Sequence, residues 1–166
     1  MMVKKLILLV EDEIEQATRL ASLIEASGQY SVLLAHDGRQ ALDQVEKHSR
    51  FLGFAKNKIK TIILDLKMPN MNGVQFLKEL RKQEYFATRM PIIVLSAYED
   101  KEKWQDVTDE HDGYACEYSK KPVNVDDLLN ILKRIHGAET EIMIQKTREK
   151  ARERKKELQD VPIETL

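Results

Sequence analysis

TIILDLKMPNMNG, residues 61–73, is the stretch that decides the predicted fold. Its first four residues are β-branched or aliphatic and indicate a short strand buried on both faces, as in a parallel sheet. Pro69 and the Asn72-Gly73 pair predict a turn, after which apolar residues recur at helical spacing from position 74. Asp65 therefore lies at the carboxyl end of a buried strand, where open α/β sheets bind their ligands.

Four further apolar segments alternate with amphipathic ones along the chain. We expect strands at 6–10, 31–35, 92–95 and 114–119, in addition to 61–64. Helices are expected over about 14–27, after Gly38, over 74–83 and 99–110, and around 128–135 with Asn124 as the N-cap. Strand and helix alternating five times predict an α/β, doubly wound three-layer sandwich with a parallel five-stranded sheet and right-handed crossovers.

The composition is that of a globular domain with a charged extension. A net charge of -1 over 166 residues implies no overall attraction to nucleic acid or to a membrane. The single cysteine, Cys116, excludes an internal disulfide and indicates a reducing compartment. The first apolar run ends at acidic residues 11–13, too early for a signal peptide or a membrane span, so we expect a cytoplasmic protein.

We divide the chain into one domain over 3–136 and a charged C-terminal extension over 137–166. Residues 142–144 could continue an amphipathic helix, but 145–156 are mostly basic, so we expect a solvated helix or a disordered end. Residues 49–60 lack clear periodicity and are expected to extend the second helix and then form a long basic loop.

Polar side chains follow the other strands as well. Glu11 and Asp12 follow the first strand, Ser96 the fourth, and Lys121 comes shortly after the fifth. Each has a simple structural explanation alone: a helix-start acid, a strand-end hydrogen bond or a solvated lysine. Because parallel strands end at one edge of a sheet, we expect all of them to meet Asp65 in one pocket.

The predicted pocket has a distinctive chemistry. Three carboxylates that lie together favour either a raised pKa or a bound cation. Oxygen ligands without clustered histidine or cysteine suit a hard ion, and Mg²⁺ fits best because it needs few protein ligands. A carboxylate can also accept a phosphoryl group as an acyl phosphate, whose charge the metal, Lys121 and Ser96 could neutralise.

These residues together resemble the receiver domain of two-component response regulators. The resemblance rests on Glu11-Asp12, the loop 65–73, Ser96-Ala97 and the sequence YSKKP at 118–122, and it covers about residues 3–136. It implies a flavodoxin-like (βα)5 fold. It also implies a cytoplasmic signalling phosphoacceptor, not an enzyme, that catalyses only its own phosphorylation and dephosphorylation.

By this resemblance, Asp65 would accept a phosphoryl group from a sensor histidine kinase or a phosphotransfer protein. Mg²⁺ would be held by Asp12, Asp65 and the backbone carbonyl of Lys67, with Glu11 assisting. Lys67 and Tyr98, two residues beyond Asp65 and Ser96, would line the approach of hydrolytic water and slow self-hydrolysis of the acyl phosphate.

The resemblance also implies a switch. Ser96 and Lys121 would contact the phosphoryl oxygens, and Lys121-Pro122 would be a cis peptide. Lys120 competes for the lysine role, but the family's lysine directly precedes the proline. Ser96 would move toward the phosphoryl group while Tyr118 rotates inward.

The switch would alter the surface formed by the fourth helix, the fifth strand and the fifth helix, which would bind a downstream protein. Two kinds of output stay open: a stand-alone receiver that acts by protein contact, and a receiver whose basic tail binds nucleic acid or dimerises. We expect neither membrane nor nucleic acid as a partner. Apolar residues do not continue at heptad spacing beyond Ile142, so a sustained coiled coil is not expected either.

Two other α/β protein classes fit the sequence less well. A phosphatase of the haloacid dehalogenase type needs a second aspartate two residues after Asp65, where this chain has Lys67. A flavodoxin-like cofactor binder needs a loop rich in Ser, Thr and Gly after the first strand, where this chain has the acidic residues 11–13.

Overall fold

The structure is a computed structural model that describes residues 3–48, 58–82, 90–97, 115–137 and 139–159. Its strands are β1 (Lys5–Val10), β2 (Tyr30–Ala35), β3 (Ile59–Asp65), β4 (Ile92–Ser96) and β5 (Ala115–Lys120). Its helices are α1 (Ile14–Ala26), α2 (Gly38–His48), α3 (Gly73–Lys82), α6 (Val125–Ile135) and α7 (Thr140–Gln159). The helix expected at 99–110, residue Tyr98 and most of the expected basic loop lie outside the described residues.

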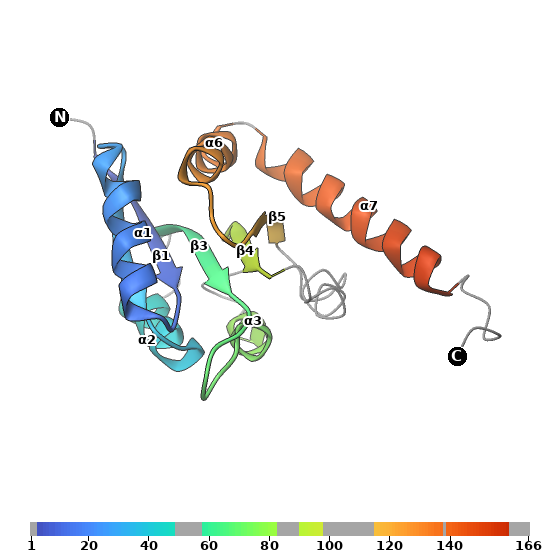
Figure 1. The fold of residues 1–166 in the computed structure, drawn as a ribbon, viewed down its shortest axis with the longest axis horizontal. Helices are drawn as coiled ribbons and strands as arrows, with labels where there is room; N and C mark the ends of the chain where they lie inside the picture. The colour runs from blue at the N-terminus through green and yellow to red at the C-terminus, as the bar shows by residue number, and fades with distance from the viewer. Residues whose placement is uncertain (1–2, 49–57, 83–89, 98–114, 138, 160–166) are drawn as a thin grey trace.

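All five strands are parallel, in the order β2-β1-β3-β4-β5, and helices pack on both faces of the sheet (Figure 1). The predicted doubly wound, flavodoxin-like fold is therefore confirmed. β3 begins at Ile59, two residues before the expected start of the strand at position 61, and so includes positions 59 and 60 of the expected basic loop. Ile59 pairs with Leu6 and is 2% exposed, so the burial of this single side chain outweighs the lysines on either side of it.

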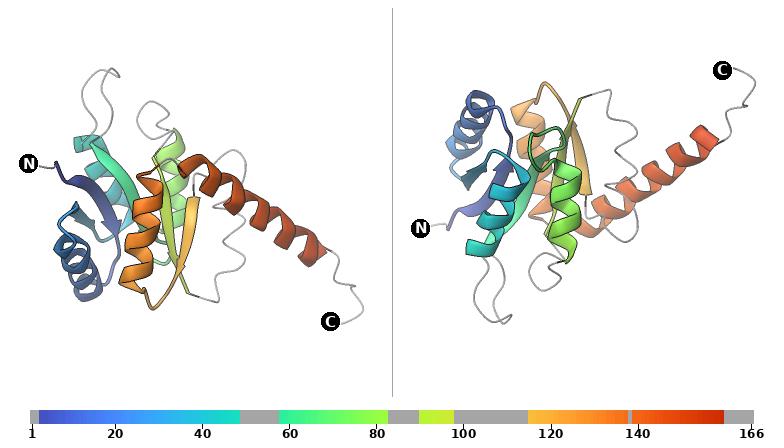
Figure 2. Two further views of the ribbon diagram at one scale, coloured as in Figure 1. Left: turned by 90° about the horizontal axis from the view of Figure 1, so that it is seen from above. Right: turned by 90° about the horizontal axis from the view of Figure 1, so that it is seen from below.

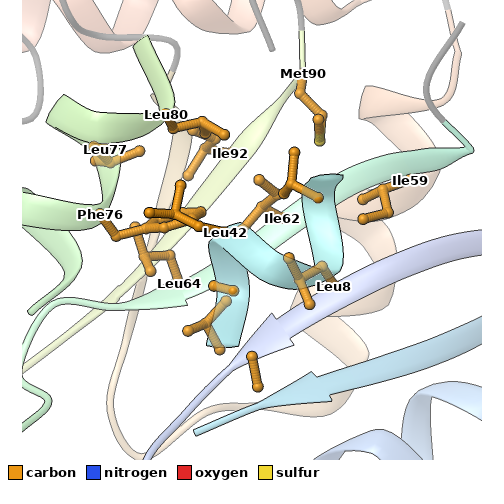
Figure 3. Packing of buried hydrophobic residues seen from close by; sticks show 14 of the residues in the cluster. Leu8, Leu42, Ile59, Ile62, Leu64, Phe76, Leu77, Leu80, Met90 and Ile92 are labelled. Carbon is orange, nitrogen blue, oxygen red and sulfur yellow. The ribbon is translucent and has the colours of Figure 1, made fainter. Parts of the chain in front are cut away.

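Two apolar clusters hold the helices to the sheet. The α2–α3 core packs strand residues such as Leu8, Ile62 and Leu64 against Leu42 and Phe76 of the helices (Figure 3). The α1–α6 core occupies the other face and is formed by Ile7, Leu9, Ala21, Ile24, Tyr30, Ile63, Ile93, Leu95, Leu128, Leu132, Ile135, Met143 and Ile144. Since β1 and β3 contribute to both cores, their near-continuous apolar runs are those of strands covered on both faces.

Two expected helix ends are confirmed. Gly28 follows α1 with a φ of 77° and donates its backbone N–H to Glu25 O at 2.9 Å, a conformation that glycine adopts without strain. At the start of α6, the Asn124 side chain accepts a hydrogen bond from the backbone N–H of Asp127 at 3.1 Å. These caps fix where the chain leaves one layer and enters the next.

The C-terminal extension forms a helix, one of its two expected forms, but the first turns of this helix are not solvated as expected. Residues 140–159 form one helix, α7, and the side chains of Met143, Ile144 and Thr147 are buried. The burial arises because Met143 and Ile144 join the α1–α6 core while the helix packs beside β5. The second half of α7 extends beyond the sheet (Figure 2). No helix in the described part of the chain is long and apolar enough to cross a membrane.

His136, the residue after α6, lies in a polar contact that the sequence did not indicate. Its Nε2 is 2.8 Å from Thr61 Oγ1, and its ring lies 5.5 Å from that of the buried Tyr30. The Nδ1 atom is buried without a hydrogen-bond partner among the described residues. Burial, with the charges of Lys5 and Lys60, lowers the pKa of His136 from 6.5 to about 4.

This pKa predicts an acid-sensitive fold. The unfolded chain takes up a proton on His136 below its ordinary pKa, whereas the folded chain does so only near the lowered pKa. Stability contributed by neutral His136 is therefore present above pH 6.5 and is lost as the pH falls toward 4. At about 1.4 kcal/mol per pKa unit, and allowing for partial solvation, we expect a loss of about 2 kcal/mol.

Urea unfolding of wild type and His136→Gln at several pH values measures this effect. The variant is expected to lose about 2 kcal/mol less than wild type over the same acid range, since both share every other titrating group. Parallel stability curves for the two proteins would contradict the assignment.

Candidate functional site

The carboxyl ends of β1 and β3 bring three acidic residues together. Glu11 follows β1 and donates its backbone N–H to Ala35 O at 3.0 Å, which anchors the start of the loop. The side chains of Glu11 and Asp65 are largely buried, and Asp12 beside them is half-buried. One carboxylate oxygen from each of the three lies within 4.8 Å of the others. The geometry thus gathers negative charge at one edge of the sheet.

Lys121 lies across this acidic group. Its Nζ donates to Asp65 Oδ2 at 2.6 Å and to Glu11 Oε2 at 2.8 Å, and its side chain is 26% exposed. Lys121-Pro122 is a cis peptide, as expected. Of the two candidate lysines, Lys121 makes these contacts, while Lys120 is an exposed residue at the end of β5. One ammonium therefore joins the ends of three strands.

The charges of the site shift the pKa values of two of its groups. Burial raises the pKa of Glu11, and the Asp65 charge adds to this rise, although Lys121 opposes both. Burial opposes the charged form of Lys121, but its hydrogen bonds to Asp65 and Glu11 and their charges outweigh burial and raise its pKa. Lys121 therefore stays an ammonium ion that is held by two carboxylates.

The loop after β3 is fixed by its own backbone. The backbone N–H of Lys67 donates to Asp65 Oδ1 at 3.0 Å, so this carboxylate is held from two sides. Gly73 donates to Leu66 O at 3.1 Å, and a Cβ at Gly73 would lie 2.5 Å from Asp65 O. A side chain at position 73 would therefore collide with the backbone that carries Asp65.

The structure gives less detail on how the remaining expected site residues lie relative to Asp65. Ser96 ends β4, and its backbone is in register with Lys120 at the same edge of the sheet. Tyr118 on β5 is half-buried and packs against the α2–α3 core. The side chain of Lys67 is exposed, and Tyr98 lies outside the described residues. The structure thus brings Glu11, Asp12, Asp65 and Lys121 together, with the backbone of Ser96 at the same edge.

Sequence reasoning missed two features of the site. His36, after β2, donates from Nδ1 to Glu11 O at 2.9 Å and so helps to hold the loop after β1. A groove of about 410 Å³ lies beside Glu11 and Lys121. It is lined by Gln16 and Arg19 and by apolar side chains of α1, of the segment after β5 and of the start of α6: Leu20, Leu23, Pro122, Val123 and Val125. The 42% exposure of Leu23 could not be predicted, because its spacing is compatible with the buried face of α1.

The acidic group fits a divalent cation. Its donors are three carboxylates, without histidine or cysteine in the cluster, and Lys121 supplies only one compensating charge. Two of the three donor side chains are buried, where unmatched negative charge is costly. Hard oxygen donors with excess negative charge are the ligands that Mg²⁺ takes in proteins.

Comparisons with known proteins agree with this fold. Residues 7–133 match the family model of the response regulator receiver domain. The transcriptional regulatory protein CpxR of Escherichia coli is 37% identical over 91 residues, which cover 55% of this chain and 33% of CpxR. The transcriptional regulatory protein ZraR of the same organism is 31% identical over 122 residues, which cover 74% of this chain and 24% of ZraR. The chain thus matches a third or less of the length of these curated relatives.

Solved structures show the same similarity. The chemotaxis protein CheY4 of Vibrio cholerae superposes with a TM-score of 0.66 at 30% identity, covering 80% of this chain and 99% of CheY4. A response regulator receiver domain protein from Clostridium thermocellum gives a TM-score of 0.61 at 27% identity, covering 92% of this chain and 98% of that one. With the family match over residues 7–133, the chain belongs to the response regulator receiver domain family.

Proposed function

We propose that this protein accepts a phosphoryl group on Asp65 from a histidine kinase or a phosphotransfer protein and acts as a cytoplasmic signalling phosphoacceptor. The observation that carries the proposal is the position of Lys121, whose Nζ contacts both Asp65 and Glu11. Asp65 lies at the sheet edge and its side chain is 8% exposed, so the carboxylate is held in place and still reachable. We assign this activity to residues 3–136 and treat 137–166 as an extension.

Asp65 acts as the nucleophile. One of its carboxylate oxygens forms a bond to phosphorus, and the electron pair of the broken P–N or P–O bond leaves with the donor. When the donor is phosphohistidine, the imidazole is the leaving group and gains a proton. Lys121, which already donates to Asp65 Oδ2, neutralises charge on the phosphoryl oxygens as the new bond forms.

Glu11, Asp12, Asp65 and the backbone carbonyl of Lys67 are the proposed ligands of Mg²⁺. The three carboxylates supply the oxygen donors, and the Lys67 backbone is already held at Asp65 by its N–H. When bound, Mg²⁺ neutralises charge on the phosphoryl oxygens. Asp12 is the most exposed of the three acids and leaves room for water and the phosphoryl group.

Two further assignments extend the proposal. Ser96 contacts the phosphoryl group and, with Tyr118, forms the switch that alters the surface around β5. Lys67 and Tyr98 slow hydrolysis by shielding the acyl phosphate from water. The support is positional: Ser96 ends β4 beside β5, and Tyr118 is half-buried on β5 itself.

The groove beside α1 is the proposed contact for the phosphodonor. A donor must bring its phosphoryl group to Asp65. The groove reaches Lys121, which contacts Asp65, and Glu11, which contacts Lys121. Its apolar lining and the 67% exposure of Ile14 offer surface that an apolar partner helix can cover. The donor is therefore expected to dock along α1 and the segment after β5.

We propose output through contact with another protein. The alternative is that the basic α7 binds nucleic acid, and two observations favour testing it: exposed Lys146, Lys150 and Arg152 on α7, and the description of CpxR and ZraR as transcriptional regulatory proteins. A gel shift measured at rising salt separates the two, because nucleic-acid binding through these residues weakens steeply with salt.

Intact-mass analysis tests the proposed function. Wild-type protein treated with acetyl phosphate in the presence of Mg²⁺ is expected to gain the mass of one phosphoryl group. The same treatment with a chelator in excess is expected to give almost none, since the three carboxylates then repel the phosphodonor. Absence of a mass gain under both conditions would contradict the proposal.

A further inference from the structure

The first two turns of α7 cover the open edge of the sheet. β5 is the last strand in the sheet order, and α7 packs against it on the side away from β4 (Figure 1). Met143, Ile144 and Thr147 in these turns are only 2%, 4% and 6% exposed, and the first two belong to the α1–α6 core. An uncovered strand edge offers backbone groups to other chains, so the position of α7 controls access to β5.

The contact is confined to a small part of α7. The buried positions 143, 144 and 147 share one face of the helix, but that face continues with Lys150. Lys150 is exposed, and the second half of this 20-residue helix extends beyond the sheet (Figure 2). A helix attached through two turns can separate locally while the rest of the domain stays folded.

β5 also connects α7 to Asp65. The strand ends at Lys120, and the next residue, Lys121, donates to Asp65 Oδ2 at 2.6 Å. A phosphoryl group on Asp65 adds negative charge and places the acceptor oxygens farther from the Asp65 backbone. If Lys121 follows these oxygens, its displacement passes directly into β5, because its backbone is continuous with that strand. A shift of β5 changes the surface that α7 contacts.

We propose that α7 is a releasable cover of the β5 edge, docked when Asp65 is unmodified and released when Asp65 is phosphorylated. This inference rests on the proposed function. Release exposes the β5 edge together with the apolar face of α7, so the same event uncovers two surfaces for a partner protein.

Limited trypsin digestion tests this proposal, because the basic residues of α7 are trypsin sites and cleavage requires local unfolding. Phosphorylation of wild type is expected to speed cleavage at Lys146 and Arg148 at least about fivefold. Without phosphodonor, Ile144→Asp is expected to speed it about tenfold, because the charge disrupts a buried contact. The matched control Ile142→Asp, at a position that is 52% exposed, is expected to stay within about twofold of wild type.

Each outcome has a distinct meaning when intact mass is followed in the same samples. If the intact mass rises by one phosphoryl group while the rate of cleavage is unchanged, the proposal that α7 is a releasable cover is wrong but the proposed function stands. If the mass does not rise, both proposals are wrong. Equal cleavage of Ile144→Asp and Ile142→Asp also overturns the cover. If Ile144→Asp does not fold, judged by circular dichroism, Met143→Ala replaces it, and its cleavage is expected to be faster than that of wild type.

Discussion

The Lys121→Met variant is expected to take up a phosphoryl group from acetyl phosphate at least about 100 times more slowly than wild type. Loss of a single preorganised hydrogen-bond donor has an effect of this size in other active sites. Methionine keeps much of the length and the apolar stem of lysine but loses the ammonium that contacts Asp65 and Glu11. Glu11 and Asp65 then lack the positive charge of the ammonium, which further disfavours the approach of an anionic donor. A time course of intact mass in the presence of Mg²⁺ measures the rate.

Lys120→Met is the matched control, since the same substitution is made one residue earlier in the chain. Lys120 is exposed at the end of β5, whereas Lys121 lies within the acidic group. The control is expected to react within about threefold of wild type, as an exposed charge has little influence through solvent. A large loss in Lys120→Met with little effect in Lys121→Met would reverse the assignment of the two lysines.

The second large effect is expected at Gly73, where Ala should lower the free energy of unfolding by about 3 kcal/mol. Its Cβ would lie 2.5 Å from Asp65 O and 2.8 Å from Leu66 Cα. Both atoms belong to the backbone, so no side-chain rotation relieves the contact. The loop must move, which also breaks the 3.1 Å hydrogen bond from Gly73 N to Leu66 O. Urea unfolding, with its slope compared to wild type, measures the loss.

Gly137→Ala provides the comparison for Gly73→Ala. Among the described residues, a Cβ at Gly137 meets the carbonyl oxygens of Arg134 and Lys133, at 3.3 and 3.4 Å. Contacts at these distances need a small adjustment, and the expected change is below about 1 kcal/mol. Similar losses in the two variants would show that the close approach at Gly73 is not the cause.

The convergence of the acidic residues could be predicted because it follows from the order of elements alone. Alternating strands and helices predict a parallel sheet, and a parallel sheet places every strand end at the same edge. Glu11, Asp12, Asp65 and Lys121 could thus be grouped before any coordinates were known. The choice between Lys120 and Lys121 needed the family resemblance, because composition and strand pattern are the same for both.

Other features depend on contacts between distant segments and could not be predicted. His136 follows a helix, a position that is typical of a solvated residue. In the fold it contacts Tyr30 of β2 and Thr61 of β3, which lie far from it in the sequence. Ile59 lies between two lysines, and only its pairing with Leu6 reveals the start of β3. The docking of α7 could not be predicted for a similar reason. Its few apolar residues are outnumbered by charges, so its attachment is set by the surface beside β5 rather than by its own pattern.

The position of the phosphoryl group within the chain is the decisive measurement for Asp65 as the phosphoacceptor. An acyl phosphate can be reduced with borohydride, which marks the modified carboxylate permanently, and peptide mass spectrometry then identifies the residue. After treatment with acetyl phosphate and Mg²⁺, the account predicts a single mark on the peptide that contains Asp65, at that residue. A mark on Glu11 or Asp12, or a phosphoryl group on a residue outside the acidic group, would contradict it.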